Sequence, residues 1–292
     1  MTSDRSDRMN GANPQCGGAE KQTISEHFDR YASTWNQKLQ QQAFQARFDV
    51  AKRFAEAVEP RSVIDVGCGT GDYCRIFDAG VDYLGIDIAK NMIDRCRELY
   101  PGRRFEVSDG EHVEEADDAF DLALSMGVLE YYQDPRPQLT ELARLVRGGG
   151  SVVVSVPNGS NRTMQLDRAV AALAKSVVGQ FIKRLTRWVP RRELTGSTLA
   201  TSKTVVHYAK TESEMRQMGI PVGLRLVDFG HVGCRILPDV SWRARRVNER
   251  ISRRIGDRPG WKWLARISAT MLIVRYEKNW GLESRRAGQS GE

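Results

Sequence analysis

The sequence lacks a long apolar run: no stretch reaches the roughly 18 uncharged apolar residues that a membrane-spanning helix needs. Residues 1–22 are polar and also lack the apolar segment of a signal peptide, so we expect a disordered tail there. Residues 283–292 have the same character and predict a second disordered tail. These absences predict a cytoplasmic protein, with peripheral contact to the inner face of the membrane left open.

Cysteine and histidine are both scarce. The five cysteines are an odd number and form no CxxC pair, and only four histidines are present. This pattern argues against a disulfide framework and against a structural zinc site, so we expect reduced, mostly buried thiols and no metal. It also restricts the histidines that could serve as a general base to His27, His112, His207 and His231.

Charge is not balanced, because the formal net charge is +7 at pH 7. A basic balance favours anionic partners such as nucleic acid, phospholipid or an acidic substrate. The net charge alone does not indicate which of these partners the protein binds.

Short apolar runs alternate with helical patterns through the middle of the chain. Runs followed by turn residues predict strands at residues 62–66, 82–86, 104–107, 120–125 and 151–156. Residues 89–99 and 137–146 lie between them and have helical spacing. This alternation predicts a parallel sheet covered by helices on both faces, with a ligand at the carboxyl ends of the strands.

Further elements are expected before and after this core. They are helices at residues 24–35, 41–58 and 211–218 and strands at residues 224–229 and 269–276. The fold class is therefore α/β: one Rossmann-like domain over residues 23–282, with a seven-stranded, doubly wound, mostly parallel sheet. We expect residues 269–276 to be an antiparallel strand beside the sixth strand. Two helical insertions, at residues 158–203 and 241–265, interrupt the alternation.

A glycine-rich loop follows the first predicted strand, in the segment VIDVGCGTG. Gly67, Gly69 and Gly71 permit a tight turn that runs into a helix and let backbone N–H groups approach a ligand. Asp65 lies two residues before the first of these glycines. Its carboxylate would repel a pyrophosphate and would suit a ligand that carries a positive amine.

Two more acids follow neighbouring strands. Asp87 ends the second strand, where an acid accepts hydrogen bonds from ribose hydroxyls in doubly wound nucleotide folds. Asp109 follows the third strand and offers an acceptor for the amine of adenine. With Asp65 they fit a ligand that has an amine, a ribose and an adenine but no phosphate. Two simpler interpretations stay open: Asp87 could cap the helix that follows, and Asp109 could only end a strand.

The segments VIDVGCGTG, GID, SDGEHV and FDLALSMGVLEYYQDP resemble the motif series of class I S-adenosylmethionine-dependent methyltransferases, in particular the small-molecule branch that includes the ubiquinone-biosynthesis O-methyltransferases. The resemblance covers residues 24–159 and, less closely, 204–230. It implies S-adenosylmethionine as the cofactor, bound by Asp65, Gly67, Cys68, Gly69, Gly71, Asp87, Ile88, Asp109, Gly110 and Met126. The family often has histidine where this chain has Tyr131, which puts any acid–base role of that position in doubt.

The implied reaction sets the remaining candidates. The sulfonium of the cofactor supplies its own leaving group, so the protein must hold the acceptor in line, exclude water and remove a proton where the acceptor has one. In the family a His-Tyr segment before the helix that follows the first insertion often faces the acceptor pocket, which makes His207 the expected base or positioning group. Acceptor contacts are expected from His27, Tyr31, Tyr131 and Tyr208. Local capping by His207, and packing of the first helix by His27 and Tyr31, are the alternatives.

The acceptor itself is predicted only by class. Residues 166–189 form a basic amphipathic pattern that could cover an active site or lie in a membrane interface, which favours a small-molecule or lipid-like acceptor. A hydroxyl oxygen is the favoured acceptor atom, with nitrogen and carbon open. The Arg-rich residues 242–254 keep RNA methylation as an alternative. A cofactor-binding protein without activity and a dinucleotide oxidoreductase are further alternatives, and Asp65 disfavours the second.

Overall fold

The computed structural model describes residues 18–39, 42–162, 165, 207–234, 247–248 and 262–280. Its elements are, in chain order, α1 (Gly18–Leu39), α2 (Gln42–Glu56), β1 (Ser62–Val66), η1 (Asp72–Ile76), β2 (Asp82–Asp87), α3 (Lys90–Leu99), β3 (Arg104–Val107), β4 (Phe120–Met126), η2 (Leu129–Tyr131), α4 (Arg136–Leu145), β5 (Val146–Pro157), α7 (Glu212–Gly219), η3 (Ile220–Val222), β6 (Leu224–Cys234), α9 (Lys262–Ser268) and β7 (Ala269–Lys278).

The strands form one seven-stranded sheet in the order β3-β2-β1-β4-β5-β7-β6. Strands β1 to β5 pair in parallel, and β7 lies antiparallel between β5 and β6. The order reverses its direction at β1 and β4, and this is the point at which doubly wound sheets bind ligands. The predicted fold class and the antiparallel strand beside the sixth strand are both confirmed.

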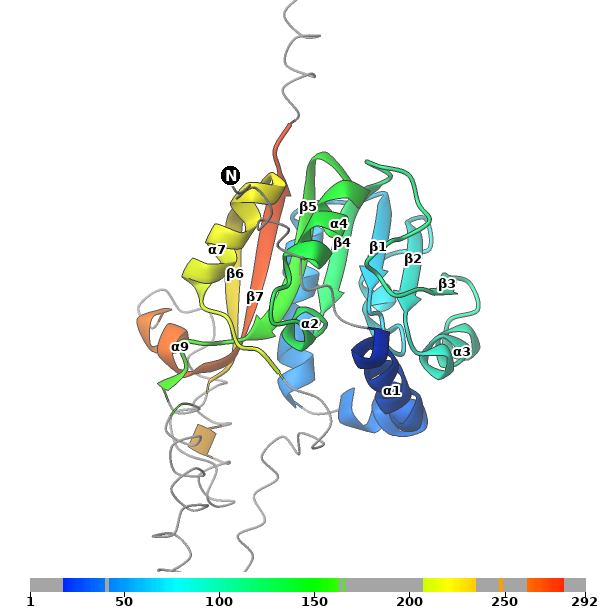
Figure 1. Cartoon of the computed structure of the whole chain (residues 1–292), viewed down its shortest axis with the longest axis horizontal. Helices are drawn as coiled ribbons and strands as arrows, with labels where there is room; N and C mark the ends of the chain where they lie inside the picture. The colour runs from blue at the N-terminus through cyan, green and yellow to red at the C-terminus, as the bar shows by residue number, and fades with distance from the viewer. Residues whose placement is uncertain are drawn as a thin grey trace, which may run out of the picture.

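Helices cover both faces of the sheet (Figure 1). In this view α4 and α7 lie in front of the sheet and α2 lies behind it. The 22-residue helix α1 lies below the carboxyl ends of β1 and β2, beside α3, as its contacts with α3 also indicate. The carboxyl edge of the sheet is therefore covered by α1, an element that comes before the sheet in the sequence.

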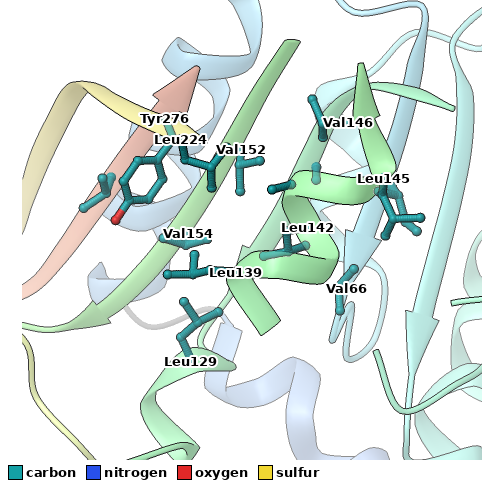
Figure 2. Packing of buried hydrophobic residues seen from close by; sticks show 14 of the residues in the cluster. Val66, Leu129, Leu139, Leu142, Leu145, Val146, Val152, Val154, Leu224 and Tyr276 are labelled. Carbon is teal, nitrogen blue, oxygen red and sulfur yellow. The ribbon is translucent and has the colours of Figure 1, made fainter. Parts of the chain in front are cut away.

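Alternating strand residues build the two cores that separate these layers. On β5, Val152 and Val154 belong to the core under α4 and α7, whereas Val153 belongs to the core under α2. Figure 2 shows Leu139 and Leu142 of α4 facing this first core. Because both faces of β5 are buried, its sequence reads as an apolar run rather than as a polar–apolar alternation.

Some boundaries differ from those predicted. Helix α1 begins at Gly18, so residues 18–22 are not part of a disordered tail. Strand β5 begins at Val146, because that residue pairs with Phe120 before the glycines at 148–150. The segment after the glycine loop is the short 3-10 helix η1 rather than an α-helix. These differences arise from pairing and docking with distant segments, which local propensity does not report.

Several predictions fall outside the described residues. Nearly all of the first insertion and of its basic helix at residues 166–189 lies there, as do residues 1–17 and 283–292 and most of the second insertion. The four cysteines that are described, Cys68, Cys74, Cys96 and Cys234, are buried, as expected, and form no disulfide with one another. In the part of the chain that the structure describes, no helix is long and apolar enough to cross a bilayer.

Substitution of Gly67 by alanine tests how tightly the loop is packed. Gly67 and Gly223 have nearly equal positive φ angles of +74° and +75°. A Cβ at Gly67 would lie 2.1 Å from Cγ2 of Val128, whereas one at Gly223 would have no neighbour within 4 Å. We expect Gly223→Ala to lower the free energy of unfolding by about 1–2 kcal/mol, and Gly67→Ala to lower it by about 1–3 kcal/mol more. Equal losses in urea unfolding of the two variants would contradict this packing.

Candidate functional site

The glycine loop between β1 and η1 adopts a backbone that favours glycine. Gly67, Gly69 and Gly71 have φ angles of +74°, +56° and +78°. The N–H groups of Gly67 and Cys68 donate to the carbonyl of Ile86 on β2, at 2.8 and 2.9 Å. The loop is therefore fastened to the end of the neighbouring strand.

Asp87 binds this loop from the end of β2. Its Oδ2 accepts the N–H of Gly69 at 2.9 Å, and its Oδ1 accepts the N–H of Ala89 at 2.9 Å, directly before α3. Burial raises the pKa of Asp87, and these backbone hydrogen bonds oppose the rise. The bond to Ala89 is the one that the capping interpretation predicted. Two carboxylate oxygens offer about four acceptor positions, so capacity remains for ribose hydroxyls, a role that stays a prediction.

Asp65 lies beneath the loop and is fully buried. Its Oδ2 accepts from the hydroxyl of Tyr83 at 2.7 Å, while its Oδ1 has no hydrogen-bond partner among the described residues. Burial raises the pKa of Asp65 to about 7, and the charge of Asp87 adds to the rise. The buried hydroxyl of Tyr73, on η1, likewise has no hydrogen-bond partner in the described part of the chain. The site thus contains two buried polar atoms to which no described residue forms a hydrogen bond.

Asp109 follows β3, as predicted, but its carboxylate is already engaged. Its Oδ1 accepts the N–H of Glu111 at 2.9 Å, and its Oδ2 lies 3.0 Å from Nζ of Lys21. Lys21 also contacts Glu111, at 2.6 Å. Although burial opposes it, the contacts with Glu111 and Lys21 lower the pKa of Asp109. The first turns of α1 are thereby fixed to the place where adenine is expected.

Helix α1 makes three further contacts around the loop. The indole nitrogen of Trp35 lies 3.6 Å from the position of a Cβ on Gly69. Ser25 donates to the carbonyl of Ile88 at 3.2 Å, and the carboxylate of Asp29 accepts the N–H of Asn91, on α3, at 2.8 Å. Helix α1 therefore covers both the glycine loop and the start of α3.

A row of rings links α1 to the predicted acceptor residues. Tyr31 lies 4.9 Å from His27, and His27 lies 5.3 Å from Phe28, between ring centroids. Phe28 lies 5.6 Å from Tyr131, and Tyr131 lies 4.9 Å from His207. Four of the five acceptor-side candidates thus lie in one continuous row. The fifth, Tyr208, joins the same region through its backbone N–H, which donates to the carbonyl of Glu130 at 2.7 Å.

The other predicted cofactor residues lie around the loop. Gly110 has a φ of +71°, and a Cβ there would lie 2.6 Å from Val66. Met126 ends β4, and with the thiol-bearing Cys68 it is buried in the core under α2. Of the two remaining histidines, His112 is exposed, whereas His231 lies on β6 with its ring 5.3 Å from that of Phe229.

Sequence reasoning missed Lys21, Arg47, Tyr73 and Glu130. Arg47, on α2, brings a guanidinium nitrogen within 3.6 Å of the position of a Cβ on Gly127, at the end of β4. Its charge also opposes the burial that raises the pKa of Tyr73 and of Tyr131. Arg47 lies in a helix with no motif around it, so no local signal could have found it.

Metal ligation finds no support in the part of the molecule that the structure describes. Across those residues no group of three or more His, Cys, Asp or Glu side chains is placed to hold a metal ion.

Comparison with known proteins finds similarity to methyltransferases. Residues 64–154 match the family described as "Methyltransferase domain". This span holds β1, the glycine loop, Asp87, Asp109 and β4, so it includes most of the candidate site.

Several curated methyltransferases have similar sequences, among them the following two. The malonyl-[acyl-carrier protein] O-methyltransferase of Pseudescherichia vulneris is 31% identical over 133 residues, which are 45% of this chain and 52% of that protein. The ubiquinone biosynthesis O-methyltransferase of Sinorhizobium medicae is 30% identical over 141 residues, 47% of this chain and 52% of that protein. The chain thus spans about half the length of the curated relatives it matches.

A solved structure extends the likeness to the whole fold. The magnesium protoporphyrin IX methyltransferase of Synechocystis PCC 6803, with bound SAH, has a TM-score of 0.59 and 13% identity, and the match covers 89% of this chain and 100% of that one. At this identity the likeness shows the fold alone. The chain is thus similar to methyltransferases in fold and, over about half of its length, in sequence, and residues 64–154 match the methyltransferase domain family.

Removal of the Lys21 charge tests how α1 is held. We expect Lys21→Met to speed hydrogen exchange of backbone amides in residues 21–30 by roughly three- to tenfold, because the ion pairs with Asp109 and Glu111 are lost. Lys52→Met is the matched control, since Lys52 forms an ion pair with Glu56 of its own helix, at 3.7 Å on the exposed face of α2. Exchange in α1 that is the same in both variants would show that these ion pairs do not fix the helix.

The raised pKa of Asp65 predicts a pH dependence of stability. The pKa is about 7 in the folded protein, against about 3.9 in an unfolded chain. Between these values the folded state binds more protons, so the free energy of unfolding falls as pH rises from about 4 to about 7. We expect Asp65→Asn to remove that fall, on the order of a few kcal/mol, in urea unfolding across this range. The exposed Asp94→Asn control should keep the wild-type slope, and a wild-type slope in Asp65→Asn would refute the assignment.

Proposed function

We propose that this protein transfers a methyl group from S-adenosylmethionine to a small-molecule or lipid-like acceptor, at a hydroxyl oxygen. The observation that carries the proposal is the preformed loop at the carboxyl edge of the sheet. Its three glycines have positive φ angles, and Asp87 holds it from the end of β2. The methyltransferase domain match over the same residues supports this interpretation.

The residues of the site fit the cofactor. The unsatisfied Oδ1 of Asp65 and hydroxyl of Tyr73 are suited to the amine of its methionyl part. Arg47, across the loop at Gly127, is suited to its carboxylate. Asp87 would hold the ribose, and Asp109 would accept from the adenine amine once it shares or exchanges its contact with Lys21.

The cofactor and the protein have different roles in the proposed reaction. The cofactor, when bound, supplies a sulfonium methyl whose leaving group is a neutral thioether. The protein must orient the acceptor and exclude water, and α1 with its aromatic row is placed for both tasks. His207, at the end of that row, is proposed as the group that takes the acceptor's proton.

A base beside the acceptor supports oxygen as the acceptor atom, because a hydroxyl must lose its proton when it is methylated. The two relatives described above are O-methyltransferases, which agrees with this choice, although another relative is a phosphatidylethanolamine N-methyltransferase. The suggestion of a lipid-like acceptor depends on the basic pattern of residues 166–189, which lies outside the described residues.

Loss of Asp87 tests the proposed function. We expect wild-type protein to bind S-adenosylhomocysteine in calorimetric titration and not to bind NAD. Asp87→Ala should weaken that binding at least about tenfold, because charged hydrogen bonds to the loop and the ligand are lost together. Labelled methyl from S-adenosylmethionine should appear in a phenolic or lipid extract with wild-type protein and much less with the variant.

The control for this test is Asp94→Ala, which removes an exposed carboxylate from α3 that pairs with Lys90. Its binding should equal that of the wild type. Thermal melting of both variants separates loss of binding from loss of fold. Wild-type protein that binds NAD, or that binds neither compound, would refute the proposal.

A further inference from the structure

A carboxylate lies directly against the proposed base. Nδ1 of His207 is 2.9 Å from Oε1 of Glu130, at the start of the segment that leads into α7. The exposed fraction of the Glu130 side chain is 11%, and that of His207 is 26%. The carboxylate is thus the buried partner, and the imidazole is the more accessible one.

Two more hydrogen bonds fasten the same segment to the residues after β4. The N–H of Tyr208 donates to the carbonyl of Glu130 at 2.7 Å. Nζ of Lys210 donates to the carbonyl of Gln133 at 2.7 Å. These two hydrogen bonds fix the segment that follows His207, and neither of them involves the Glu130 carboxylate. The carboxylate is therefore not required to attach this segment to the residues after β4.

The burial of Glu130 supports this interpretation. Its Oε2 is buried and has no hydrogen-bond partner among the described residues. A buried polar atom without a partner costs free energy, and an apolar residue at this position would avoid the cost. A carboxylate kept there despite the cost is expected where it acts on a neighbouring group.

We propose that Glu130 is the positioning residue of His207, an inference that rests on the proposed methyl transfer. An ionised carboxylate only accepts hydrogen bonds, so Nδ1 of His207 carries the hydrogen. In the neutral ring the lone pair then belongs to Nε2, on the edge of the imidazole that faces away from Glu130. Glu130 thereby selects the tautomer that can accept a proton on the accessible side of the ring.

The surroundings of this pair are defined. The ring of Tyr131 lies 4.9 Å from that of His207, and the Glu130 charge adds to the burial that raises the pKa of Tyr131. The charge of Arg47 lowers the pKa of Tyr131, and the charge of Asp87 raises it. No second carboxylate is found in hydrogen-bond contact with His207 in the described part of the chain.

The proton then has a defined route. As the acceptor oxygen forms its bond to the methyl carbon, the carbon–sulfur bond breaks and sulfur keeps the electron pair. The hydroxyl proton moves to Nε2 of His207. The resulting imidazolium is paired with the Glu130 carboxylate, so no net charge is left unbalanced at this site.

Nitrogen NMR of the histidine rings tests the proposal on the full chain saturated with S-adenosylhomocysteine. Only four histidines are present, and His207→Gln identifies the signals of His207. At a pH about two units above the ordinary histidine value of about 6.5, the neutral ring of wild-type His207 should carry its hydrogen on Nδ1. Glu130→Gln, whose amide oxygen can still accept, should keep this tautomer, and Glu130→Leu should lose it. Leucine at the exposed Glu114 is the control and should change nothing.

Each outcome of this experiment supports or contradicts the proposed role of Glu130 or the proposed function. A hydrogen on Nε2 of wild-type His207 overturns the proposal even where Glu130→Leu does not fold. The proposal is also overturned if the Glu130→Leu variant folds and binds S-adenosylhomocysteine, yet His207 keeps its hydrogen on Nδ1. Loss of the Nδ1 tautomer in Glu130→Leu with its rescue in Glu130→Gln supports the proposal. Failure of the wild type to bind S-adenosylhomocysteine would instead refute the proposed function.

Discussion

The carboxylate of Asp87 is the interaction on which the site depends. One oxygen holds the N–H of Gly69 and the other holds the N–H of Ala89, each at 2.9 Å, so a single side chain joins the glycine loop to the start of α3. A loop with positive φ angles at three glycines has few side-chain contacts of its own to fix its shape. Its shape therefore comes from the ends of β1 and β2, which the parallel sheet sets side by side.

Helix α1 forms the second part of the site, opposite the carboxyl edge of the sheet. It reaches over the carboxyl edge and contacts Asp109 through Lys21, the start of α3 through Ser25 and Asp29, and the glycine loop through Trp35. The same helix starts the aromatic row that ends at His207. One helix thus contacts both the residues proposed to bind the cofactor and those proposed to face the acceptor.

The sequence predicts the sheet well for a physical reason. Strands such as Ser62–Val66 are buried on both faces, so a short apolar run before turn residues is a strong signal. The positions of Asp65, Asp87 and Asp109 at strand ends follow from the same pattern. What each carboxylate binds does not follow, because Tyr83 and Lys21 come from other elements. Asp65 in particular is fully buried beneath the loop, which its position in the sequence does not indicate.

The residues that sequence reasoning missed also depend on contacts between distant segments of the chain. Glu130 stands in a motif that resembles the methyltransferases, yet its partner His207 is 77 residues further along the chain. Arg47 reaches Gly127 from a helix whose sequence shows only a buried face and a polar face. Such contacts between distant segments appear only once the fold is known.

A crystal structure of the protein with S-adenosylhomocysteine tests the central claim most directly. The account predicts the adenosine at the carboxyl edge under α1, its ribose hydroxyls on Asp87, and the bond from Gly69 to Asp87 retained. A ligand bound elsewhere, or a loop that abandons Asp87 when the ligand binds, would contradict it.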